Sequence, residues 1–199
     1  MHKKIAIIGA GGHGKVVGEI ALLNQYKIIN FFDNRANQIK EFPFTIIDNL
    51  DYLSDHHEDY DSFFVAIGEN KLRFEMIEWL KKYNVNIVNL THPKSTVSKF
   101  SSLGGGSCIM ANAVVNPGCI IKEGVIINSS ASVDHDCVIE DFAHISPNST
   151  LSGGVKIGKF THLGSGTSVH PKITIGNNVK IGVGSRIFKD ILDDTIFKN

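Results

Sequence analysis

The second half of the chain has an aliphatic residue at every sixth position, and this spacing restricts the fold more than any other feature of the sequence. From Val97 onward, sixteen consecutive positions in this frame are leucine, isoleucine or valine. A second column of small or branched residues follows each of them by four positions, from Ser101 to Ile191. The aliphatic column is Val97, Leu103, Ile109, Val115, Ile121, Ile127, Val133, Ile139, Ile145, Leu151, Ile157, Leu163, Val169, Ile175, Ile181 and Ile187.

The two columns predict short strands joined by tight turns. If both columns point inward, the residue between a small position and the next aliphatic one points outward, which is the alternation of a strand. Turn-forming residues fill the intervening pairs, as in Pro117-Gly118, Pro147-Asn148 and Gly153-Gly154. Three strands close one coil of eighteen residues, so sixteen hexads predict a little over five coils of a parallel β-solenoid.

Residues 1 to about 90 follow a different pattern, which predicts a small α/β domain. Apolar strands are expected over 4–8, 28–32 and 63–67, with a last short strand over 87–90. Apolar residues at helical spacing predict helices over 13–24 and 71–83. Strands that alternate with helices favour a parallel sheet, here only half the size of a full dinucleotide-binding fold.

The segment from Gly9 to Gly14 fits the pattern GxGxxG between the first strand and the first helix. Glycines there let the backbone approach a phosphate, and the helix start offers free N–H groups and a positive dipole end. Asp33, at the end of the second strand, could accept a hydrogen bond from a ribose or a base. A purely structural turn and an NAD site are the alternatives, and the absence of a second mononucleotide half disfavours NAD.

Composition and charge exclude several classes of function. Twenty basic and twenty acidic residues give no formal net charge, so we expect neither nucleic-acid binding nor membrane binding. Three cysteines without a CxxC pair argue against a disulfide framework and a zinc knuckle, and favour a reducing compartment. The apolar run over 5–8 is too short for a signal peptide or a membrane span. We therefore expect a cytoplasmic protein without membrane insertion.

Several histidines lie within the repeat, and the frame puts them outside the inward columns. His135 lies at a corner beside Asp136, where a carboxylate can orient an imidazole and stabilise its protonated form. An acyl transfer needs such a base and a donor for the developing oxyanion, and His144 or a backbone N–H could supply the donor. Cys119 and Cys137 fall in the inward column, so we expect them to be packing residues rather than nucleophiles.

Two other readings of the solenoid remain open. His144, His162 and His170 could hold zinc between subunits in a lyase of the carbonic-anhydrase type. A trimeric scaffold without catalysis is the second, although it would not require a His-Asp corner.

The two halves together resemble the PglD/NeuD family of bacterial sugar acyltransferases. The resemblance rests on the glycine-rich opening, on the segment 64–68 and on the segment from Asn128 to Ile139, which contains His135 and Asp136. It implies an N-terminal Rossmann-like nucleotide-sugar domain over 1–92, a left-handed β-helix over 93–192 and a short tail over 193–199. Family members usually continue with a Gly-x-Pro-Ala-Lys-like tail, and no such segment follows Ile187.

The resemblance also implies an activity and a set of site residues. We expect a homotrimeric N-acetyltransferase that transfers acetyl from acetyl-CoA to the 4-amino group of a UDP-linked amino-deoxy sugar for surface glycans, without a metal. O-acetylation of a sugar or a sialic acid is the alternative, and the choice among UDP, GDP, CMP and free sugars stays open. The implied residues are His135 and Asp136 for catalysis, His144, Ser165 and Val183 for acetyl-CoA, and Gly11, Gly12, His13, Asp33, Asn34 and Gly68 for the nucleotide sugar.

Overall fold

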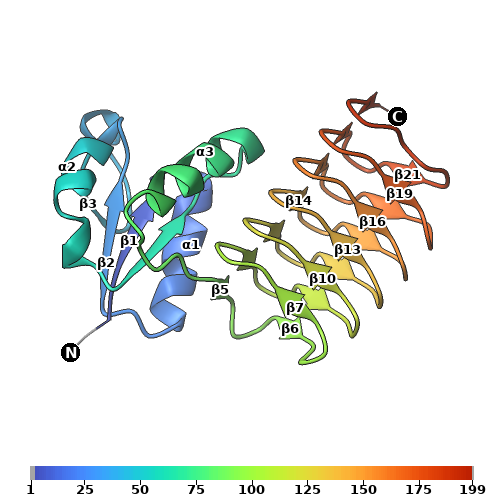
Figure 1. Cartoon of the computed structure of the whole chain (residues 1–199), viewed down its shortest axis with the longest axis horizontal. Helices are drawn as coiled ribbons and strands as arrows, with labels where there is room; N and C mark the ends of the chain where they lie inside the picture. The colour runs from blue at the N-terminus through green and yellow to red at the C-terminus, as the bar shows by residue number, and fades with distance from the viewer. Residues whose placement is uncertain (1–2, 199) are drawn as a thin grey trace. The chain divides into compact units, whose positions relative to one another are not determined.

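The computed structural model describes residues 3–198. The chain divides into two compact units, one up to Leu90 and one from Thr91 onward. This boundary lies two residues before the one expected from the sequence. Figure 1 shows the elements of each unit.

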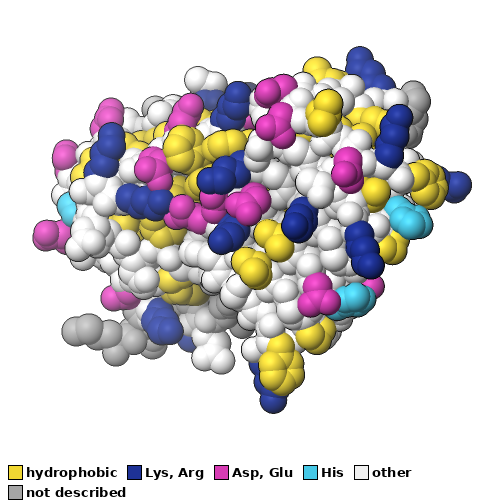
Figure 2. Space-filling model, turned by 45° about the vertical axis from the view of Figure 1, so that its right-hand side comes forward, with side chains coloured by type: hydrophobic (Ala, Val, Ile, Leu, Met, Phe, Trp, Pro, Cys, Tyr) yellow, Lys and Arg dark blue, Asp and Glu magenta, His cyan; other side chains and the backbone are white. Residues whose placement is uncertain are grey.

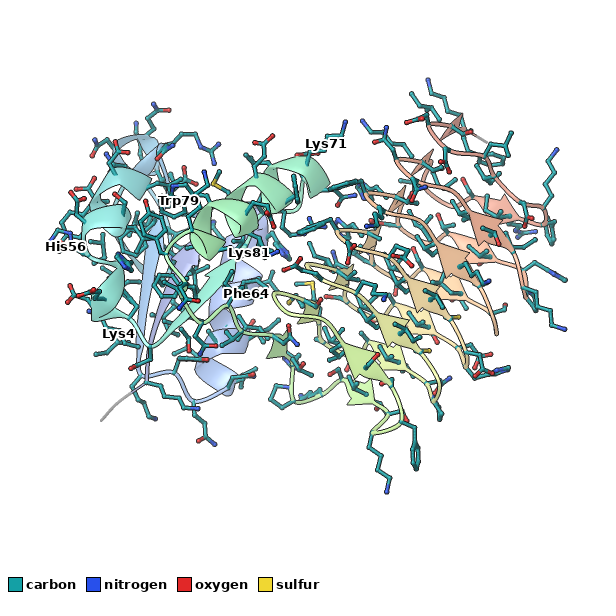
Figure 3. All side chains as sticks on the ribbon, viewed as in Figure 1. Lys4, His56, Phe64, Lys71, Trp79 and Lys81 are labelled. Carbon is teal, nitrogen blue, oxygen red and sulfur yellow. The ribbon has the colours of Figure 1, made fainter. Side chains whose placement is uncertain are left out.

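The first unit is a four-stranded parallel sheet with helices. Its strands have the order β3-β2-β1-β4, so β1 has β2 on one side and β4 on the other. Phe64 of β4 is buried. Lys71 lies in the first turn of α3 and Lys81 is its last residue (Figure 3). The elements are β1 (Lys4–Ile8), α1 (Gly12–Leu23), β2 (Ile28–Phe32), η1 (Ala36–Gln38), β3 (Thr45–Asp48), α2 (Leu50–Asp55), η2 (His57–Asp59), β4 (Ser62–Val65) and α3 (Asn70–Lys81).

The sequence patterns located three of these strands and both long helices to within about two residues. They missed β3 and α2, which are short and mostly exposed and so carry no clear apolar period. The strand expected over 87–90 is also different. Ile87 forms only an isolated bridge to Phe63, and Leu90 and Thr91 form β5, which belongs to a sheet of the second unit. None of the helices within residues 3–198 is long and apolar enough to cross a bilayer.

The second unit is a parallel β-helix of two-residue strands stacked in three sheets (Figure 1). Strands eighteen residues apart pair in register, for example Ile121 with Ile139 and Ile127 with Ile145. The strands are β5 (Leu90–Thr91), β6 (Thr96–Val97), β7 (Ser102–Leu103), β8 (Cys108–Ile109), β9 (Val114–Val115), β10 (Ile120–Ile121), β11 (Ile126–Ile127), β12 (Ser132–Val133), β13 (Val138–Ile139), β14 (His144–Ile145), β15 (Thr150–Leu151), β16 (Lys156–Ile157), β17 (His162–Leu163), β18 (Ser168–Val169), β19 (Thr174–Ile175), β20 (Lys180–Ile181), β21 (Arg186–Ile187) and β22 (Ile196–Phe197).

Both columns of the repeat face the interior, as the sequence predicts. From Ser107 and Ile109 onward, the members of both columns are buried, including the thiols of Cys119 and Cys137. Hydroxyl groups inside the coil donate to backbone carbonyls, as Ser107 Oγ does to Lys122 O at 2.9 Å. The polar members of the small column are therefore hydrogen-bonded within the core.

The last coil is two residues shorter than the others. Ile175 bridges to Ile191, and Lys180 of β20 pairs with Ile196 of β22, so the repeat there is sixteen residues. The segment after residue 192, which the sequence predicts to be a tail, thus adds one more strand, β22, to the β-helix. On the face shown in Figure 2, cationic and anionic side chains are interspersed, in agreement with the balanced composition.

Candidate functional site

A cavity of about 490 Å³ lies in the first unit at the carboxyl ends of β1, β2 and β4. This is the point where the strand order reverses about β1, which is where open α/β sheets bind ligands. The structure brings all six predicted nucleotide-sugar residues to this one cavity. They are Gly11, Gly12, His13, Asp33, Asn34 and Gly68.

The glycines of the loop after β1 have separate roles. Gly9 has φ of +103°, and an added Cβ would lie 2.9 Å from Ala66 O. A Cβ on Gly14 would overlap Gly9 O, so this glycine lets α1 pack closely against the loop. Gly11, in contrast, faces open space. As the N-cap of α1 it has no side chain to satisfy the first N–H groups, which leaves them available to an anion in the cavity.

Asp33 is buried at the edge of the cavity and is held by Arg35. Its Oδ1 accepts from the backbone N of Arg35 at 2.9 Å and from Arg35 Nε at 3.1 Å. Its Oδ2 accepts from Ala10 N at 3.1 Å and from Arg35 Nη2 at 3.2 Å. Burial alone would raise the pKa of the Asp33 carboxyl, but these hydrogen bonds and the charge of Arg35 hold it below its usual value.

His13 contributes a neutral imidazole to the same region. The residue is half-buried, and its Nε2 is shielded from solvent and has no hydrogen-bond partner among the described residues. Burial, together with the charge of Arg73, lowers the pKa of His13 to about 4. The buried Arg73 donates to the carbonyl oxygens of Ile67 and Gly68 at 3.0 and 3.1 Å, and so fixes the loop after β4.

His135 and Asp136 form a pair at a corner of the β-helix, as expected. His135 Nδ1 lies 2.8 Å from Asp136 Oδ2, and their side chains are 62% and 72% exposed. Asp134 Oδ1 accepts from the backbone N of His135 at 2.8 Å and from Asn116 Nδ2 at 3.0 Å, which holds the corner in place. The hydrogen bond to Asp136 and the charge of Asp134 raise the pKa of His135. Because Asp136 engages Nδ1, Nε2 is the nitrogen left to take a proton from a substrate.

Two glycines of neighbouring coils make room for this pair. An added Cβ on Gly153 would lie 2.5 Å from His135 Nε2 and 2.6 Å from its Cε1. An added Cβ on Gly118, at φ of +78°, would overlap Asp136 Oδ1. The sequence pattern predicts both glycines only as turn residues. Their positions, eighteen residues after His135 and eighteen before Asp136, were the available signal.

His144 lies outside the core, between the inward Ala143 and Ile145, yet it is only 8% exposed. Asn128 Oδ1 accepts from the backbone N of Ser129 at 2.8 Å, so its Nδ2 faces His144 Nε2 at 3.0 Å and donates to it. His144 Nε2 is therefore an acceptor, and the ring proton lies on Nδ1. The ring stacks in parallel on that of His162, with 4.6 Å between their centroids.

The remaining predicted residues lie at another corner. Ser165 and Val183 are corner residues one coil apart, between the sheets of β17 and β18, whereas His135 lies between those of β12 and β13. Val183 is 72% exposed. Within one chain, His135 and these two predicted coenzyme residues therefore lie at different corners of the β-helix. Within residues 3–198, no group of three or more His, Cys, Asp and Glu side chains is placed to hold a metal ion.

Comparison with known proteins is decisive for the family. Residues 4–80 match the PglD N-terminal domain, and residues 154–189 match the bacterial transferase hexapeptide (six repeats). The structure is similar to the acetyltransferase domain of PglB from Neisseria gonorrhoeae FA1090 in complex with acetyl coenzyme A. The TM-score is 0.93 at 39% identity, over 100% of this chain and 98% of that one. The chain belongs to the PglD/NeuD family of hexapeptide-repeat sugar acyltransferases.

Two further relatives support this assignment. A point mutant of perosamine N-acetyltransferase from Caulobacter crescentus, in complex with CoA and GDP-perosamine, has a TM-score of 0.91 at 31% identity, over 98% of this chain and 93% of that one. UDP-N-acetylbacillosamine N-acetyltransferase of Bacillus subtilis (strain 168) is 34% identical over 124 residues, which are 55% of this chain and 52% of that protein. The chain thus matches about half the length of this curated relative. The predicted family and fold class, an α/β domain followed by a left-handed parallel β-helix, are confirmed.

Proposed function

We propose that the protein is an acetyl-CoA-dependent N-acetyltransferase that acts on the amino group of a nucleotide-linked amino sugar. The observation that carries the proposal is the exposed His135-Asp136 pair with its 2.8 Å contact, on a β-helix like that of a relative solved with acetyl coenzyme A. The cavity of the first unit supplies a place for the nucleotide. An amine acceptor is supported by two N-acetyltransferase relatives. One is named for a UDP-linked sugar, and the other was solved with GDP-perosamine.

In the proposed reaction, the sugar amine attacks the thioester carbonyl of acetyl-CoA directly. His135 Nε2 takes the proton of the amine as the C–N bond forms, and Asp136 stabilises the resulting imidazolium through Nδ1. The C–S bond then breaks, CoA leaves as the thiolate, and the imidazolium returns a proton to it. His144, with its ring proton on Nδ1, is the proposed donor near the acetyl group.

We also propose that the site is completed by neighbouring protomers of a homotrimer. His135 lies at one corner of the β-helix, whereas Ser165 and Val183 lie at another, so a coenzyme that contacts both groups must lie between two copies. Location in the cytoplasm is part of the proposal. It is supported by three cysteines that are all free thiols.

The test is release of free CoA from acetyl-CoA in the presence of UDP- and GDP-linked amino sugars, with hydroxyl sugars and sialic acids as comparison acceptors. We expect His135→Ala to reduce turnover by about 10² to 10⁴ with unchanged thermal unfolding. His170→Ala, which changes an exposed histidine of the same unit, is the matched control. Full activity of His135→Ala, or transfer only to hydroxyl acceptors, would overturn the proposal.

A further inference from the structure

The buried carboxylate in the nucleotide cavity has no acceptor capacity left for a ligand. A carboxylate offers about four lone-pair sites, and each oxygen of Asp33 already accepts two hydrogen bonds. Three of the four come from Arg35, two of them from its side chain. The carboxylate is therefore neutralised and saturated by the planar guanidinium, a geometry that lysine cannot reproduce.

The groups beside Asp33 in the cavity are hydrogen-bond donors. Asn34 Oδ1 accepts from the backbone N of Leu50 at 3.2 Å, which directs the Nδ2 donor of Asn34 away from that contact. Arg35 lines the same cavity, and its side chain is 66% exposed with a further guanidinium nitrogen beyond the two that bind Asp33. A nucleobase placed here meets hydrogen-bond donors but no free acceptor on the Asp33 carboxylate.

Nucleobases differ in the hydrogen-bond donors and acceptors that they present to these residues. Uracil offers two carbonyl oxygens as acceptors and a single N–H. Guanine offers the acceptors O6 and N7 and, unlike uracil, two adjacent donors, N1–H and N2–H₂, which match the two oxygens of a free carboxylate. Because the buried Asp33 has no acceptor left, the site withholds from guanine the pair of hydrogen bonds that a free carboxylate would accept from it.

We infer that the Arg35-Asp33 ion pair sets the nucleobase preference, so that the cavity favours a uridine nucleotide over a guanosine nucleotide. Arg35 is then a specificity-determining residue that acts by occupying Asp33. The inference rests on the proposed function only in assuming that the cavity binds the nucleotide part of the substrate. It requires that removal of the Arg35 side chain frees two acceptor positions on Asp33 and shifts the preference toward guanine.

The test measures binding of UDP and GDP, without sugar or acetyl-CoA, by calorimetry on the full chain. We expect the wild type to bind UDP more tightly than GDP, and Arg35→Ala to shift the ratio of the two dissociation constants toward GDP by about tenfold or more. Arg35→Lys, which keeps the charge but loses the planar fork, is expected to give a smaller shift in the same direction. Lys27→Ala, an equal change of charge at an exposed residue that does not line this cavity, is the control.

The outcomes separate this inference from the proposed function. Equal binding of UDP and GDP by the wild type, or an unchanged ratio in Arg35→Ala with unaltered thermal unfolding, overturns the role of Arg35. Failure of the wild type to bind either nucleotide contradicts nucleotide-sugar recognition itself. Retention of acetyl transfer to a GDP-linked amino sugar by the wild type, at a rate equal to that for the UDP-linked sugar, also overturns the inference.

Discussion

Replacement of Gly153 by alanine tests whether the β-helix holds His135 by leaving space for its ring. The added Cβ would lie 2.5 Å from His135 Nε2, whereas carbon and nitrogen atoms in contact are normally about 3.5 Å apart. The imidazole must therefore retreat by about 1 Å. A displacement of about 1 Å in a catalytic group costs about 100-fold in rate, so we expect kcat/KM to fall by about that factor.

The fold should tolerate this change. The His135 side chain is 62% exposed, so the ring has room to swing outward without disturbing the core. Gly153 also lacks the positive φ that makes a side chain strained. We therefore expect unchanged thermal unfolding and a pH profile of kcat/KM that differs from that of the wild type, because the contact between His135 and Asp136 changes with the ring.

The assay is release of CoA under steady-state conditions, with Gly105→Ala as the matched control. Gly105 is also a corner glycine without positive φ, but an added Cβ there meets nothing within 4 Å. We expect full activity from Gly105→Ala. Wild-type kcat/KM in Gly153→Ala would refute the steric argument, and equal losses in both variants would assign the effect to the turn rather than to His135.

Three further changes test other parts of the site. Asp136→Asn removes the carboxylate that raises the pKa of His135, so it should move the acid limb of the kcat/KM profile to lower pH and should lower the maximal rate. An unmoved limb would show that Asp136 does not act through His135. Asn128→Ala should lower kcat about tenfold, because it releases the tautomer of His144, the proposed hydrogen-bond donor to the acetyl group. The ¹⁵N signals of that ring are the readout, and an unchanged tautomer would contradict this. Gly9→Ala should destabilise the first unit by about 1–3 kcal/mol, because a φ of +103° is unfavourable for a residue with a Cβ. Denaturant unfolding measures this, and an unaffected midpoint would argue against strain at Gly9.

The sequence was most informative where a simple period governs burial. In the β-helix, the six-residue period predicted the inward columns and the position of His135 at a corner, because each strand buries the same positions as the one before it. The first unit was less predictable. Strand β3 is exposed over most of its length, so its residues follow no period and only its pairing with β2 defines it.

The candidate site shows the same division between local and long-range information. The contact between His135 and Asp136 joins adjacent residues, so the sequence alone could suggest it. The role of Arg35 could not be read in this way although it is only two residues from Asp33, because its contact depends on a side-chain rotamer. The fourth hydrogen bond that saturates Asp33 comes from a distant residue, through the backbone N–H of Ala10. A pattern that identifies Asp33 as a nucleotide ligand says nothing of what already occupies its oxygens.

Stacked coils add a rule by which such partners can be sought. A residue at position i lies beside positions eighteen before and after it, since the coils pair in register at that separation. Asn116 binds Asp134 in this way, Gly118 leaves space for Asp136, and Gly153 leaves space for His135. The glycines that flank this corner are thus constrained by side chains a full coil away, and not only by the turns in which they lie. A substitution at either glycine should affect the His135-Asp136 pair even though the catalytic residues themselves are intact.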